Sequence, residues 1–77
     1  MSDITPSWIK GRLIAEGIIS YSVFQSIEIT INENEVRIIC EDEDTIAIFT
    51  KKQTLIKKFE EQLSKDIENV KIVVRLR

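Results

Sequence analysis

The sequence predicts one small α+β domain over residues 1–77, with the element order α-β-β-(β)-α-β, a mostly antiparallel sheet and two helices packed on one face. Apolar residues alternate with polar ones at 27–31, 36–40 and 70–76, which is typical of strands with one buried face. Helical spacing marks the segments on either side of the first two strands. Hydrophobic residues make up 43% of the chain, a fraction typical of folded rather than disordered proteins.

The first helix has a clear start and a clear end. Thr5 suits the N-cap position, and Pro6 follows it at the first helical position, where its missing N–H costs nothing. Gly17 is typical of a helix terminator. Residues 18–24, IISYSVF, then form either a short apolar connector or a second short helix.

Two strands follow as a predicted antiparallel hairpin. Ile27, Ile29 and Ile31 alternate with polar residues in SIEITI, and the residues NENE provide the turn. In the second strand, 36–40, the even-numbered residues are predicted to face the core, and Arg37, Ile39 and Glu41 to face outward.

Residues 45–50, TIAIFT, fit two structures. As a strand, the segment has a high density of β-branched residues, and the preceding acids form a hairpin loop. As a helix, it begins after an N-cap at Asp42 or Asp44, with acids at the positive end of the helix dipole. We favour the strand, because the alternation there is local. The following segment, 53–65, is helical on either interpretation.

The last segment, VKIVVRLR at 70–77, is a strand with an apolar and a basic face. A helix precedes it, so this strand joins the sheet beside an earlier strand, and a parallel pairing is open to it.

Composition argues against several kinds of chemistry. The chain has no His, so the commonest general base and the commonest metal ligand are missing. We expect Cys40 to lie in the core and the acidic run 41–44 to be a solvated turn or helix N-terminus. We therefore expect no enzyme activity, no catalytic residue, no metal or cofactor, and no small-molecule substrate. No signal peptide or membrane span is recognisable, so we expect a cytoplasmic protein that does not bind membranes.

Basic residues concentrate in the C-terminal part of the chain. The net charge is −2, but residues 1–44 carry −6 and residues 45–77 carry +4. A surface of this kind could contact nucleic-acid phosphates, although no aromatic residue is interleaved for base stacking. The candidate nucleic-acid residues are Lys51, Lys52, Lys57, Lys58, Lys71, Arg75 and Arg77.

The outward-facing side of the predicted sheet carries a second signal. Ile39 and Val73 interrupt the polar alternation of their strands. If the two strands are neighbours, these residues form an apolar patch framed by Arg37 and Arg75, suited to a protein partner or a second copy of the chain. For Trp8 we favour a core position over an exposed partner contact.

Two family resemblances depend on residues 45–50. If they form a strand, VRIICEDEDTIAIFTKKQTLIKKFEEQL, preceded by a Trp-bearing helix, resembles the core of the Alu-RNA-binding small subunits of the signal recognition particle, which implies a heterodimer that binds RNA on its sheet. If they are helical, the chain resembles the KH-like N-terminal interaction domain of the replication initiator DnaA, an αββαβ unit, which implies recruitment of proteins. The Gly-x-x-Gly loop of a nucleic-acid-binding KH domain is missing from the sequence.

These observations favour a non-catalytic protein–protein interaction module, a homodimer or a small subunit of a larger complex, that uses Arg37, Ile39, Val73 and Arg75. The alternative is binding of RNA or other single-stranded nucleic acid through the basic residues.

Overall fold

Seven helices and strands follow one another in the computed structural model, which describes residues 4–77. Helices α1 (Pro6–Ala15) and α2 (Tyr21–Ser26) precede strands β1 (Glu28–Asn32) and β2 (Glu35–Cys40). Helices α3 (Glu43–Thr50) and α4 (Gln53–Leu63) then lead to strand β3 (Lys71–Leu76). The predicted α+β class is confirmed, with four helices in the described part of the chain where the sequence predicted two.

Helix α1 begins and ends where the sequence predicted. The Thr5 side chain accepts a hydrogen bond from the backbone N–H of Trp8 at 3.1 Å, and Pro6 occupies the first turn. Gly17 adopts a positive φ of 76°, which glycine reaches without steric cost. The N–H of Gly17 then donates to the carbonyl of Ile14, and the N–H of Ile18 to that of Leu13, both at 3.0 Å. These two bonds form a Schellman motif, which satisfies carbonyls that the helix end leaves free.

The predicted strand at 45–50 is wrong, because this segment is helix α3. The side chain of Asp42 caps the helix by accepting hydrogen bonds from both the backbone N–H and the hydroxyl of Thr45, each at 2.8 Å. The helix buries Thr45 and Phe49, one turn apart, against the core. The order α-β-β-β-α on which the first resemblance depends is therefore not formed. The helical alternative, on which the second resemblance depends, is the one observed, and that resemblance itself stays a prediction.

The sheet has the order β1-β2-β3, with β2 in the centre. Strand β1 pairs antiparallel with β2, whereas β3 pairs parallel with β2. The sheet is thus mixed, not mostly antiparallel as predicted. Asn34, in the turn between β1 and β2, connects the two pairings: its carbonyl accepts from the N–H of Lys71, and its side chain donates to the carbonyl of Asn69, both at 2.8 Å.

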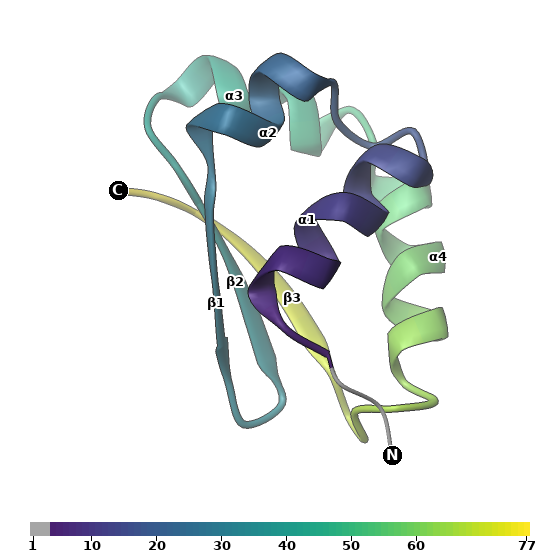
Figure 1. The fold of residues 1–77 in the computed structure, drawn as a ribbon. Coiled ribbons are helices and arrows are strands. Elements are labelled where there is room, and N and C mark those ends of the chain that lie inside the picture. Colours follow the sequence, from purple (N-terminus) through teal and green to yellow (C-terminus); the bar gives the residue numbers. More distant parts are fainter. Residues whose placement is uncertain (1–3) are drawn as a thin grey trace.

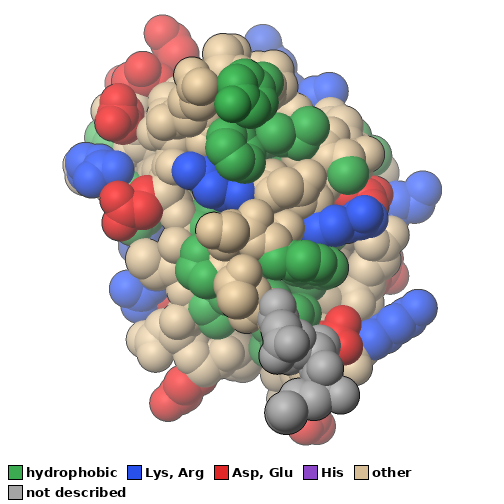
Figure 2. Space-filling model, viewed as in Figure 1, with side chains coloured by type: hydrophobic (Ala, Val, Ile, Leu, Met, Phe, Trp, Pro, Cys, Tyr) green, Lys and Arg blue, Asp and Glu red, His purple; other side chains and the backbone are tan. Residues whose placement is uncertain are grey.

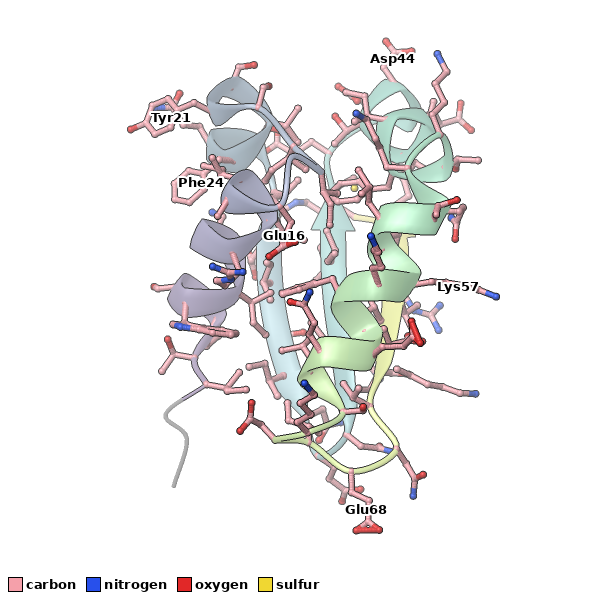
Figure 3. The ribbon with its side chains drawn as sticks, turned by 90° about the vertical axis from the view of Figure 1, so that its right-hand side faces the viewer. Glu16, Tyr21, Phe24, Asp44, Lys57 and Glu68 are labelled. Atoms are coloured by element: carbon pink, nitrogen blue, oxygen red, sulfur yellow. The ribbon has the colours of Figure 1, made fainter. Side chains whose placement is uncertain are left out.

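All four helices lie on one side of the sheet (Figures 1 and 3). Helix α1 packs along β1, and α4 packs beside β3, so the two longest helices cover the two edges of the same face. The core fills the space between these layers. Its fully buried large side chains are Phe49, Phe59, Ile9, Leu13, Ile18, Ile38, Leu63, Val36 and Cys40.

The opposite side of the sheet carries none of the described helices, and we call it the outer face. Its side chains come from alternate residues of each strand. They are Glu28, Thr30 and Asn32 of β1, Glu35, Arg37 and Ile39 of β2, and Lys71, Val73 and Arg75 of β3.

Candidate functional site

The four residues predicted to bind a partner lie together on the outer face. Arg37 is paired with Val73, and Ile39 with Arg75, across the parallel ladder between β2 and β3. Ile39 and Val73 are therefore diagonal neighbours, with an arginine beside each. Both apolar side chains are half-buried, whereas the two arginines are exposed. The predicted juxtaposition is confirmed, and the role of these residues in binding stays a prediction.

The charges of the outer face are only partly neutralised. Arg37 forms an ion pair with Glu35 on its own strand, and Arg77 reaches Glu28 on β1 at 3.2 Å. Arg75 and Lys71 take part in none of the ion pairs within residues 4–77. The outer face therefore has an excess of positive charge around its apolar pair, although the whole chain has a net charge of −2.

The candidate nucleic-acid residues are divided between two regions. Lys71 and Arg75 lie on the outer face, and Arg77 follows β3 directly. The four lysines lie on the helical side: Lys51 and Lys52 connect α3 to α4, and Lys57 and Lys58 are exposed on α4. Of these, Lys57 points outward on the side of β3 in Figure 3. The structure thus assembles no single basic surface from all seven.

The sequence did not predict that aromatic residues on α1 and α2 are exposed. Trp8 is 43% exposed, so its predicted core position is wrong, and Tyr21 is 65% exposed. Tyr21 stacks on Phe24 with ring centroids 5.6 Å apart, and the Lys10 ammonium lies 4.8 Å from the Phe24 ring centre. Figure 2 shows hydrophobic side chains gathered over these helices. The signal was present in IISYSVF, where the helical alternative turns Tyr21 and Phe24 to one side.

A pocket of ≈ 400 Å³ lies between the start of α1 and strand β1. Charged residues of both signs line it, among them Lys10, Glu28, Glu41 and Arg77. Ser7 and Ser26 add hydroxyl groups. Because its charges are mixed and Arg77 and Glu28 pair with each other, the pocket favours no particular ligand.

The acidic run 41–44 forms the start of α3, one of the two positions predicted for it. The hydrogen bonds from the backbone N–H and the hydroxyl of Thr45 stabilise the carboxylate of Asp42 and lower its pKa below the ordinary value of 3.8. Glu43 and Asp44 lie in the first helical turn, where the dipole favours negative charge. Their place is explained by helix formation alone.

Cys40 lies in the core, as predicted, and is fully buried. Burial, and then the negative charge of Asp42, raises the pKa of its thiol above the ordinary value of 9.0. A thiol in this environment is a poor nucleophile at neutral pH.

Within residues 4–77 no group of three or more His, Cys, Asp or Glu side chains is arranged to hold a metal ion. The same part of the chain contains no helix with the length and apolarity needed to cross a membrane.

Comparison of this chain with models of protein families, with curated proteins and with solved structures finds no match.

Proposed function

We propose that this protein is a non-catalytic protein–protein interaction module that binds its partner through the outer face of its sheet. The observation that carries the proposal is the diagonal pair Ile39 and Val73 between Arg37 and Arg75 on a face that no described helix covers. Apolar groups at the centre of a charged rim are the usual composition of a protein interface.

The excess charge of the outer face supports a partner with acidic groups. Lys71 and Arg75 have no intramolecular ion-pair partner in the described part of the chain. A carboxylate of the partner can therefore pair with them without displacing a carboxylate of this chain. Charge complementarity of this kind mainly accelerates association and selects the partner.

The outer face is too small to form a stable interface by itself. Three strands at about 4.8 Å spacing and six residues at about 3.3 Å rise cover roughly 300 Å², whereas a stable interface buries about 800 Å² per partner. A homodimer restricted to this face is therefore weak. A subunit of a larger complex, whose partner also contacts surrounding surfaces, is the stronger form of the proposal. The single thiol of Cys40 is free and buried, which is compatible with a reducing compartment, and we propose a cytoplasmic location.

Self-association is tested by light scattering over a range of concentrations. We expect wild-type protein to exceed the monomer mass at high concentration and Ile39→Asp to remain monomeric, because a charge at the centre of the patch must be desolvated in the dimer. Tyr21→Asp is the matched control, because it places the same acid at an exposed apolar site on another surface. Wild-type protein that stays monomeric would exclude the homodimer, and loss of association only in Tyr21→Asp would move the interface to α2.

The larger complex is tested by capture from the native lysate, with and without nuclease. We expect captured proteins to survive nuclease and to be lost with Ile39→Asp but kept with Tyr21→Asp. Capture that disappears on nuclease treatment would favour the nucleic-acid alternative. Capture unchanged by Ile39→Asp would refute the outer face as the binding surface.

A further inference from the structure

Strand β3 is an edge strand with unpaired backbone groups. The N–H of Lys71 donates to the carbonyl of Asn34, and that of Arg77 to the carbonyl of Cys40, each at 2.8 Å. Since backbone groups of a strand alternate between its two sides, the odd-numbered residues of β3 bond to β2. The N–H and C=O groups of Ile72, Val74 and Leu76 therefore point to the free edge, where no further described strand pairs.

One of these edge groups already has an acidic acceptor. The carboxylate of Glu60, on α4, accepts a hydrogen bond from the N–H of Ile72 at 2.8 Å. This bond occupies the start of the edge and ties α4 to β3. Val74 and Leu76 have no such partner among the hydrogen bonds of residues 4–77, and Leu76 is 52% exposed. The open part of the edge is therefore its C-terminal half.

The side chains of the edge disfavour a second copy of this strand. In an antiparallel pair of two copies, Lys71, Val73 and Arg75 of one copy would lie opposite the same row of the other, so that like charges meet. Lys57 adds a further positive charge where it points outward from α4 on this side (Figure 3). A partner strand whose acidic side chains lie on the outer face would instead place negative charges opposite the basic residues of β3.

We propose that the free edge of β3 binds an extended acidic segment of the partner protein by strand addition. The segment pairs its backbone with Val74 and Leu76, and its acidic side chains lie on the outer face beside Arg75. This inference rests on the proposed function, because the same partner then contacts the outer face and the adjacent edge. It also supplies contact area that the outer face alone lacks.

Single-stranded RNA fits this edge less well than a peptide does. RNA carries negative charge, but it has no regular row of amide donors and carbonyl acceptors to match those of an edge strand. Base stacking needs exposed aromatic rings. The large exposed aromatic residues of the described chain, Trp8 and Tyr21, lie on α1 and α2, on the helical side of the sheet.

The test measures binding of a synthetic peptide in which Glu alternates with Val and Thr, using fluorescence anisotropy at low and physiological salt. We expect the peptide to bind and a scrambled peptide of the same composition to bind weakly. Val74→Pro removes one edge N–H, and Pro is tolerated on the free side of an edge strand. It should weaken binding by about tenfold, because one backbone hydrogen bond and its neighbouring contacts are lost. Val74→Thr, which has nearly the same shape and keeps the N–H, should bind like wild type.

Amide hydrogen exchange on the wild-type protein gives an independent measurement if Val74→Pro does not fold. Peptide should slow exchange at Val74 and Leu76 and leave the residues of β1 unchanged. Three results would each overturn the proposal. The peptide does not bind at low salt, or Val74→Pro binds it as tightly as wild type does. The third is a single-stranded RNA of similar length that binds more tightly than the peptide and binds Val74→Pro as well as wild type.

The variant Ile39→Asp separates this inference from the proposed function. Ile39 lies on the central strand opposite Arg75, so Ile39→Asp places a carboxylate beside Arg75 but leaves the edge N–H and C=O groups of β3 free. Peptide addition at β3 should therefore persist in this variant and weaken less than in Val74→Pro. If peptide binding persists in both Ile39→Asp and Val74→Pro, the edge is not the site. If Ile39→Asp keeps the natural partner but Val74→Pro loses it, the edge is correct and the outer-face proposal fails.

Discussion

At the scale of single residues, Cys40 shows how position decides reactivity. Its side chain is fully buried in the central strand, and burial together with Asp42 raises the pKa of the thiol. The thiolate, which is the reactive form, is therefore scarce, and reagents reach the sulfur only when the structure opens.

We predict that Cys40 reacts with an aromatic disulfide reagent at least about a hundredfold more slowly in the folded protein than in guanidinium, because reaction requires opening of the core. Because the folded state holds the thiol proton more tightly, stability should fall as pH rises past 9.0, the ordinary pKa of the thiol, through its raised value in the folded state. Cys40→Ser should lower the free energy of unfolding by about 1–3 kcal/mol, because it buries a hydroxyl group without a hydrogen-bond partner. Fast reaction under native conditions would contradict the buried position.

At the scale of elements, α3 depends on a side-chain cap more than on the helix propensity of its sequence. Four of its eight residues, Thr45, Ile46, Ile48 and Thr50, are β-branched and lower its intrinsic helix propensity. The two bonds from Thr45 to Asp42 fix the first turn, and the burial of Phe49 holds the next.

We predict that Asp42→Ala destabilises the protein at every pH, whereas Asp42→Asn stays close to wild type at neutral pH, because an amide oxygen also caps. The pKa of Asp42 is lower in the folded protein than in the unfolded chain. The stabilisation that depends on the Asp42 charge is therefore complete above about pH 3.8 and is lost as the pH falls through the lowered pKa of Asp42 in the folded protein. Denaturant unfolding followed by circular dichroism should show this acid-induced loss in wild type and a flatter profile in Asp42→Asn. Equal acid profiles would refute the cap as its source.

The sequence predicted those elements whose signals are local. The Thr5 cap and Gly17 define α1, and alternation defines the three strands, all with bounds close to those observed. Residues 45–50 could not be assigned locally, because their β-branched residues suit a strand. Long-range packing decides between the two structures: as a helix the segment buries Thr45 and Phe49 against the core, and β3 takes the place beside β2.

The candidate site was predictable in part for the same reason. Ile39 and Val73 stood out because they interrupt an alternation that the sequence displays directly. The free donors of β3 depend on which residues bond to β2, and this follows only from the parallel register. The exposure of Trp8 likewise depends on which neighbours cover α1, and nothing in its own segment specifies that.

At the scale of the whole molecule, the distribution of charge separates the two candidate functions. The helical side carries most of the lysines predicted to contact phosphate, and the outer face carries the arginines with the apolar pair. Of the seven candidate residues, Lys57, Lys58, Lys71 and Arg75 come from α4 and β3, the elements that border the free edge. Arg77 follows β3 and is already paired with Glu28. One single strand of nucleic acid therefore has about four cations within its path.

About four phosphate contacts with single-stranded RNA correspond to a slope of roughly −3 in log K against log salt concentration, so binding weakens about sixtyfold between 50 and 200 mM salt. We expect anisotropy with a labelled oligouridine to show no binding tighter than about 10⁻⁴ M at physiological salt, which is the weak end of non-specific association. Arg75→Gln should lower the slope by about one contact, whereas Lys65→Gln, outside the candidate set, should leave it unchanged. Sub-micromolar binding of the RNA at physiological salt would favour nucleic-acid binding over protein binding as the function. About four cations cannot provide that affinity, so the chain would need a surface that also contacts the bases.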